Sequence, residues 1–251
     1  APTILPVNDQ VNLYHMPHVP NDTARFDLYF NAGKIRNQKS LSSFVNGLLF
    51  SGTKDKTSVE INAAINRLGG FLDTGLSAEN AVISMYCLKE HLPELFDILF
   101  DAITNVSFRE DEVSDFLSDR KQKLQISREK VSYLAQSNFQ KELFASDERY
   151  AVILEDEHFD LVTQNDLKEF HKQFILNGLD RVVVVGDIPQ DQIEYIATKS
   201  SEIASTSKAE FAESLENRVG SSHIEKEGAL QSAIRVGRTL FNKNHPDYLD
   251  F

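Results

Sequence analysis

The first hundred residues alternate between two hydrophobic patterns. Residues 24–32 (ARFDLYFNA) place apolar side chains at every second position, which predicts a half-buried strand, and residues 11–15 predict a shorter one. Residues 40–51 instead space their apolar side chains three and four apart, which predicts a helix. Phe71–Leu76 and Ala81–Leu88 predict a second pair of strands, joined by a polar turn.

Helical spacing dominates the next hundred residues. Thr57 followed by Glu60 is a capping-box pattern that opens a helix, and two glycines at 69–70 end it. Four consecutive valines at 182–185 have no polar break, which predicts a strand covered on both faces. Further helices are expected at residues 92–103, 110–130, 132–145, 163–174 and 189–199.

The composition changes after residue 199. Residues 200–222 contain seven serines and no sustained apolar pattern, which indicates a linker. We therefore expect a first domain at 1–199 and the beginning of a second at 223–251, with a strand at 232–241 and a helix starting near His245. Because the sequence stops inside an element, we expect this second domain to be truncated.

Charge and cysteine content limit the classes of partner. The net charge of -12 disfavours nucleic acid and anionic membranes, because both repel an acidic surface. A single cysteine, Cys87, excludes an intrachain disulfide framework and multi-cysteine metal sites. No window reaches the ~18 apolar residues of a membrane span. The chain starts without Met, so a periplasmic or otherwise exported location stays open if a signal has been removed.

Five local strings occur along the chain in this order: FNAG (30–33), GLLFSGT (47–53), INRLGGFLDTGLSAENAVISM (65–85), CLKEHLPELFDIL (87–99) and VVVVGDI (182–188). Together they resemble the half-domain of pitrilysin/insulinase-type zinc peptidases, whose relatives include mitochondrial processing peptidase and the core proteins of respiratory complex III. The resemblance covers about residues 11–199 and implies an α+β fold, with a mixed, largely antiparallel sheet covered by helices. From residue 231 the sequence resembles the opening of the second half-domain.

The resemblance also indicates where zinc chemistry should lie. Active members carry the motif His-x-x-Glu-His on the helix before the GLLFSGT-like string. The two histidines bind zinc, and the glutamate acts as general base. Here Ser43, Asn46 and Gly47 stand at these three positions. Serine is a poor zinc ligand, asparagine accepts no proton, and glycine has no side chain. If mid-helix, Gly47 should tolerate substitution well.

No other residues replace the missing ligands. The family's third ligand is a glutamate on the long downstream helix, and the equivalent stretch at about 121–126 has no carboxylate. His15 and His18 are three apart, but on a strand they would face opposite sides. His91 stands at a helix start, where a solvated or capping role is expected, and the other four histidines are scattered without ligand spacing. We therefore expect no catalytic residue, no metal and no cofactor.

The resemblance implies a non-catalytic role. The chain would contribute to the peptide-binding chamber of a peptidase whose zinc lies in a homologous partner chain or domain. Extended substrates of this family add to the edge formed by the strand after the double glycine, so Asp73, Thr74 and Gly75 are the expected peptide-binding residues. Two alternatives stay open: a purely structural subunit like the complex III core proteins, and an active zinc endopeptidase with an unrecognised site.

Overall fold

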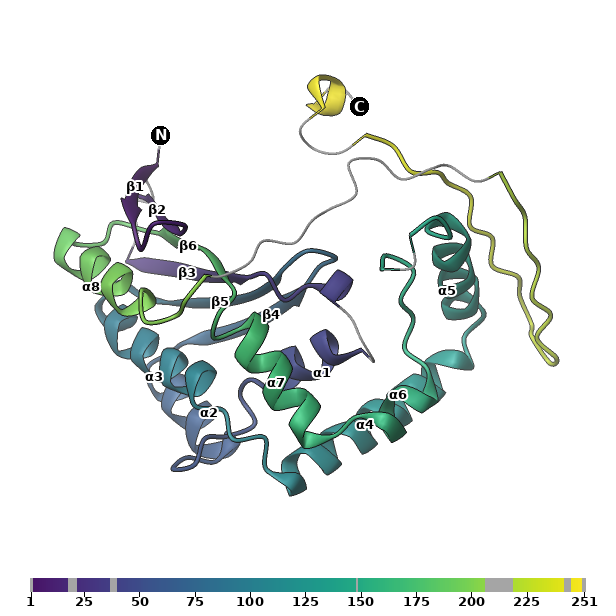
Figure 1. Ribbon diagram of the computed structural model, residues 1–251, viewed down its shortest axis with the longest axis horizontal. Helices are drawn as coiled ribbons and strands as arrows, with labels where there is room; N and C mark the ends of the chain where they lie inside the picture. Colours follow the sequence, from purple (N-terminus) through teal and green to yellow (C-terminus); the bar gives the residue numbers. More distant parts are fainter. Residues whose placement is uncertain are drawn as a thin grey trace.

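A six-stranded mixed sheet forms the centre of the molecule, with strand order β1-β2-β6-β3-β5-β4 (Figure 1). The computed structural model describes residues 2–17, 22–36, 40–147, 149–205, 219–241 and 245–249. The strands are β1 (Thr3–Pro6), β2 (Asn12–Met16), β3 (Thr23–Phe30), β4 (Phe71–Leu76), β5 (Ala81–Leu88) and β6 (Leu179–Val185). β2 and β6 run parallel and the other four neighbouring pairs are antiparallel, which confirms the predicted α+β class.

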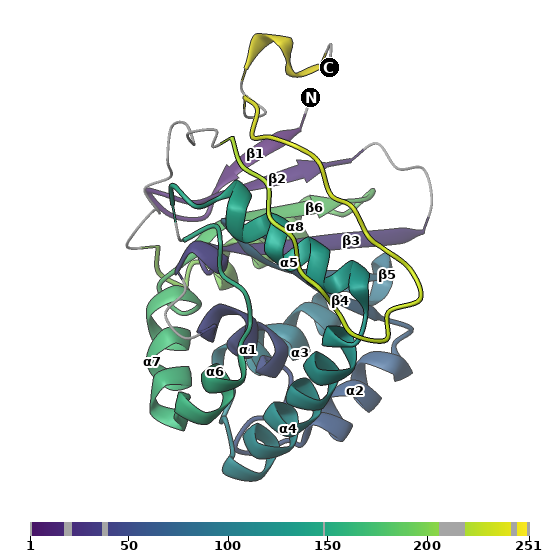
Figure 2. The same ribbon diagram turned by 90° about the vertical axis from the view of Figure 1, so that its right-hand side faces the viewer.

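Helices cover one face of this sheet (Figures 1 and 2). Those packed on it are α1 (Leu41–Leu48), α2 (Ser58–Arg67), α3 (Leu92–Thr104) and α8 (Gln190–Ser200), and α7 (Gln164–Phe174) packs against α1. Thr57 and Glu60 form the predicted capping box at the start of α2. Short 3-10 helices occur at Lys34–Arg36 (η1), Lys89–His91 (η2) and Pro246–Leu249 (η3).

The core lies between the sheet and these helices. Phe26 of β3 and Phe96 of α3 are fully buried and meet edge to face, with ring centroids 5.2 Å apart. The opposite face of the sheet is open, and Phe71 and Tyr86 lie on it with 65% and 39% of their surface exposed. The prediction that the valine strand is covered on both faces is therefore wrong: alternate valines of β6 are only half-buried, because helices cover one face alone.

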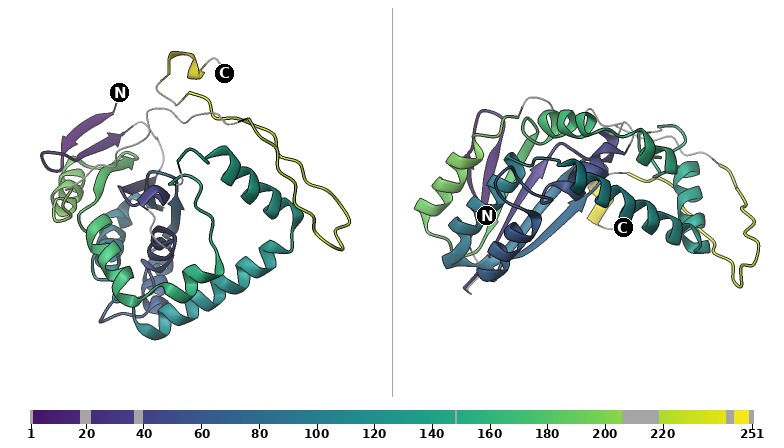
Figure 3. Two further views of the ribbon diagram at one scale, coloured as in Figure 1. Left: turned by 45° about the vertical axis from the view of Figure 1, so that its right-hand side comes forward. Right: turned by 90° about the horizontal axis from the view of Figure 1, so that it is seen from below.

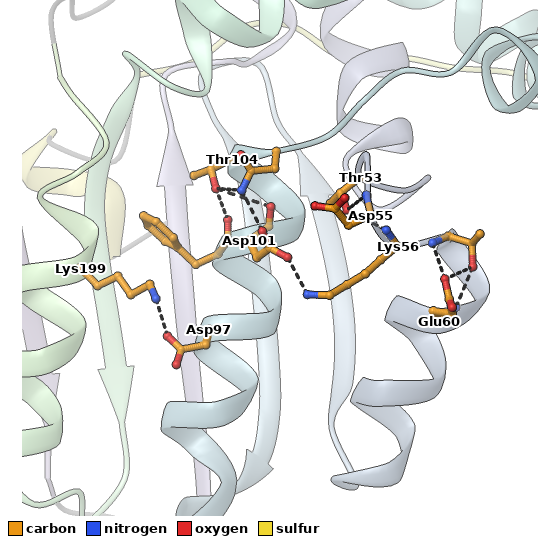
Figure 4. A network of polar contacts seen from close by, with 11 residues as sticks. Thr53, Asp55, Lys56, Glu60, Asp97, Asp101, Thr104 and Lys199 are labelled. Carbon is orange, nitrogen blue, oxygen red and sulfur yellow. Dashed lines mark hydrogen bonds and ion pairs between the residues drawn. The ribbon is translucent and has the colours of Figure 1, made fainter.

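Ion pairs connect α3 to its neighbours (Figure 4). Lys56, in the loop between α1 and α2, binds the Asp101 carboxylate at 2.7 Å, and Lys199 of α8 binds Asp97 at 2.8 Å. These side chains are all partly exposed, so water and salt weaken their attraction. These ion pairs connect α3 to the α1–α2 loop and to α8, and they do not indicate a ligand site.

α4 (Glu110–Arg128), α5 (Val131–Leu143) and α6 (Asp156–Leu161) extend beyond the sheet as an arm, and residues 219–241 run beside α5 (Figures 2 and 3). Lys226 pairs there with Glu129 at 2.8 Å. The strand predicted at 232–241 is not formed: these residues have no strand partner among the described residues, and Val236 is 91% exposed. Without a neighbouring strand there are no ladder hydrogen bonds to hold the segment, and its exposed backbone groups are left to water.

The first structural unit continues past α8. Ile203 is buried, and Ser205 forms an isolated bridge with Gly178. Residues 206–218 of the expected linker lie outside the described residues. Within the described part of the chain, no helix is both long and apolar enough to cross a membrane.

Candidate functional site: the motif helix and the edge strand

The helix α1 carries the three positions at which the family's zinc motif would stand. Phe44, Val45 and Leu48 are buried in the core, which fixes the orientation of the helix. Because residues three and four apart share a helix face, Ser43 and Gly47 lie together, and contacts from α4 show that this face meets that helix.

Two side chains of α4 occupy the space in front of this face. The Arg120 guanidinium donates a hydrogen bond from Nη2 to Ser43 Oγ at 3.0 Å. The Phe116 ring lies against Gly47, and a Cβ atom on Gly47 would be only 2.5 Å from the ring Cζ atom. Phe116 also meets Phe44 edge to face, with centroids 6.5 Å apart. A cation and an aromatic ring thus fill the region where zinc ligands would converge.

These contacts bear on one expectation about α1. Gly47 is exposed, but a side chain there would meet the tip of the Phe116 ring, so substitution at this position requires the ring to move. Local helix propensity does not report this contact, because the ring comes from α4, 69 residues further along the chain.

The donor set does not fit a zinc ion. Ser43 is hydrogen-bonded to a permanently charged guanidinium, which would repel a divalent cation. The Asn46 Oδ1 atom is buried without a hydrogen-bond partner, but a neutral amide oxygen is not among zinc's usual ligands. The described residues contain no cluster of three or more His, Cys, Asp or Glu side chains that could hold a metal.

Two buried histidines have structural roles elsewhere. His15 Nε2 lies 3.0 Å from the Gly186 carbonyl oxygen, and His171 Nε2 lies 2.7 Å from that of Ile103. Burial lowers the pKa of His171, so its ring stays neutral around pH 7. The Cys87 thiol is buried as well, and desolvation raises its pKa to about 11, which leaves it unreactive.

The strand β4, which holds the expected peptide-binding residues, lies at one end of the sheet and pairs only with β5 among the described strands. The helix α1 contacts it. Asp73, Thr74 and Gly75 are all exposed. The strand therefore has one side of its backbone bonded to β5 and one side directed away from the sheet.

The phase of the hydrogen bonds decides which backbone groups point away. Ser77 N donates to Asn80 O at 2.8 Å in the β4–β5 turn, and Lys89 N donates to Asp22 O at 2.8 Å at the far end of β5. Bonded and non-bonded pairs alternate along an antiparallel ladder. Both bonds lead to the same assignment. Asp73 and Gly75 form hydrogen-bonded pairs with β5, whereas the N–H and C=O of Thr74 point away from β5.

The sequence pattern therefore located the edge but not its outward residues. Of the three expected residues, Thr74 alone presents its backbone to the free side. The same phase adds two residues that the sequence analysis did not name, namely Leu72 and Leu76. Counting back from the hydrogen-bonded Ser77–Asn80 pair, positions 75, 73 and 71 bond to β5, and the positions between them face outward.

A mixed sheet with helices on one face, and a motif helix whose Ser43, Asn46 and Gly47 are not zinc ligands, define a peptidase-like domain. The sequence matches the insulinase family (Peptidase family M16) over residues 15–156, more than half of the chain. The chain belongs to this family.

Curated relatives match parts of the chain at low identity. A probable alpha-1 subunit of the mitochondrial-processing peptidase from Arabidopsis thaliana is 27% identical over 111 residues, covering 43% of this chain and 22% of that protein. An uncharacterized zinc protease from Rickettsia felis is 22% identical over 194 residues, covering 72% of this chain and 44% of that protein. The chain thus spans less than half the length of these relatives.

Solved structures show the same fold. A peptidase M16 inactive domain from Pseudomonas fluorescens superposes with a TM-score of 0.77 at 16% identity, covering 86% of this chain and 54% of that one. The periplasmic protease PqqL from Escherichia coli superposes with a TM-score of 0.69 at 15% identity, covering 84% of this chain and 25% of that one. At such identities the likeness concerns the fold.

Proposed function

We propose that the chain is a non-catalytic half of an M16-type peptidase, which binds extended peptides along β4 while zinc and catalysis lie in a homologous partner chain or domain. The observation that carries this proposal is the contact of Arg120 and Phe116 with the Ser43–Gly47 face of α1. It supports a motif helix whose ligand face is partly covered by side chains of α4, in addition to having lost its ligands.

The free edge of β4 supports the peptide-binding part of the proposal. Strand addition uses backbone groups of the receiving strand and needs no metal ligand. Thr74 presents an outward N–H and C=O, and α1 beside the strand gives an incoming peptide a second wall. The expected division into a half-domain at 1–199, a linker at 200–222 and the start of a second half at 223–251 belongs to the same proposal.

Binding without cleavage is the expected behaviour of the chain alone. A fluorescein-labelled, unstructured peptide should raise its anisotropy on titration with the purified chain, and mass spectrometry should find the peptide intact after long incubation with added zinc. Cleavage that a chelator abolishes would show an active enzyme. An unchanged anisotropy at protein concentrations up to about 1 mM, the weak limit of specific affinities, would favour the structural subunit.

A further inference from the structure

Arg120 differs from the other basic residues of α4, because no carboxylate among the described residues pairs with it. Within the described residues, Lys121 pairs with Asp160 at 2.8 Å, Lys123 with Asp119 at 2.6 Å, and Arg128 with Glu155 and Asp156. No ion pair of Arg120 occurs there, and its hydrogen-bond acceptor is the neutral Ser43 hydroxyl. Among the described residues, Arg120 is therefore the one cation of α4 without an ion pair, and it faces the motif helix.

We propose that Arg120 is an anion-binding residue that takes a carboxylate group of the bound peptide, where active relatives hold a metal. This inference rests on the proposed peptide binding along β4. It adds the substrate class: peptides that carry an acidic side chain or a free C-terminus near the edge strand.

The surroundings of Arg120 suit this role. Its side chain is half-buried, so an ion pair formed there is screened less than one at the surface. The bond to Ser43 uses one of five N–H donors, which leaves the others for a bidentate contact with a carboxylate. The guanidinium carbon also lies 6.0 Å from the centre of the Phe116 ring, at the outer limit of a cation–π contact.

The position of Arg120 is compatible with a peptide on β4. α1 contacts both β4 and α4, so the Ser43–Arg120 pair and the edge strand adjoin the same helix. A helix with its side chains is about 10–12 Å across. Three or four residues of extended peptide span about that distance. The net charge of -12 repels acidic peptides from the rest of the surface, so a preference for them requires a local cation.

The test compares matched peptides by fluorescence anisotropy on the whole 251-residue chain. One fluorescein-labelled peptide carries a single central glutamate and its twin carries glutamine, and each is made with a free and with an amidated C-terminus. We expect the glutamate peptide, the free C-terminus, or both to bind about tenfold more tightly than the uncharged form, the gain typical of one charge-assisted hydrogen bond. The two comparisons identify which carboxylate is bound.

Three variants assign the preference to Arg120. Arg120→Gln should bind all peptides with equal affinity, and Arg120→Lys should keep part of the preference because it keeps the charge. Arg67→Gln, which removes an equal charge from an exposed position at the end of α2, should leave the preference unchanged. Circular dichroism checks that each variant is folded.

The outcomes separate this inference from the proposed function. Equal affinity of the wild-type chain for all four peptides would overturn the role of Arg120 while leaving peptide binding intact. A preference that persists in folded Arg120→Gln would overturn it as well. Failure of every peptide to bind would overturn both.

Discussion

Restoring His, Glu and His at positions 43, 46 and 47 is expected to give neither a zinc site nor a peptidase. A histidine at 47 would collide with the Phe116 ring, which lies 2.5 Å from the position of the first side-chain atom. A histidine at 43 would face the Arg120 guanidinium, whose charge opposes a divalent cation. We expect the triple variant to lose about 1–3 kcal/mol in free energy of unfolding, measured by urea titration, and to bind no stoichiometric zinc.

A matched variant tests whether Phe116 and Arg120 obstruct zinc binding or whether only the zinc ligands are missing. Adding Phe116→Ala and Arg120→Glu to the triple variant removes the ring and the positive charge, and supplies a carboxylate opposite the restored motif. Zinc binding by isothermal titration should then appear, although orienting contacts would still be missing. Chelator-sensitive peptide cleavage by the triple variant alone would show that Phe116 and Arg120 do not block the site.

Replacing Thr74 with proline is expected to weaken peptide binding at least about tenfold, because one outward donor is lost and the ring obstructs the edge. The outward N–H of Thr74 makes no ladder bond to β5, so the melting temperature should change little. Anisotropy titration measures the affinity, and thermal unfolding followed by circular dichroism measures the stability.

Asp73→Pro is the control, because it removes a donor that bonds to β5 opposite Ser84. This variant should melt clearly below the wild type, since it breaks the ladder itself. Unaltered peptide affinity in folded Thr74→Pro would remove β4 as the binding edge. Equal melting temperatures of the two variants would show that the assignment of Asp73, and not Thr74, as bonded to β5 is wrong.

Local patterns were enough to predict most elements of the fold. Alternation identified β3, valine content identified β6, and the Thr57–Glu60 pair located the start of α2. The four-residue strand β1 and the six-residue helix α6 were missed, because segments this short do not show a hydrophobic periodicity.

The candidate site was only partly predictable, because its decisive contacts join distant segments. The sequence shows that Ser43, Asn46 and Gly47 cannot bind zinc, since side-chain chemistry alone decides that. It does not show that α4 brings Arg120 and Phe116 against them, which depends on how two helices pack. The outward direction of Thr74 depends likewise on the β4–β5 register.

The zinc content of the wild-type chain tests the central claim most directly. The purified chain is equilibrated with excess zinc, desalted and submitted to elemental analysis, with an Asn46→Ala variant treated in parallel. Because Ser43, Asn46 and Gly47 offer no competent ligand and Arg120 faces them, we predict far less than about one ion per chain in both proteins. About one ion per wild-type chain, absent from Asn46→Ala, would contradict the account.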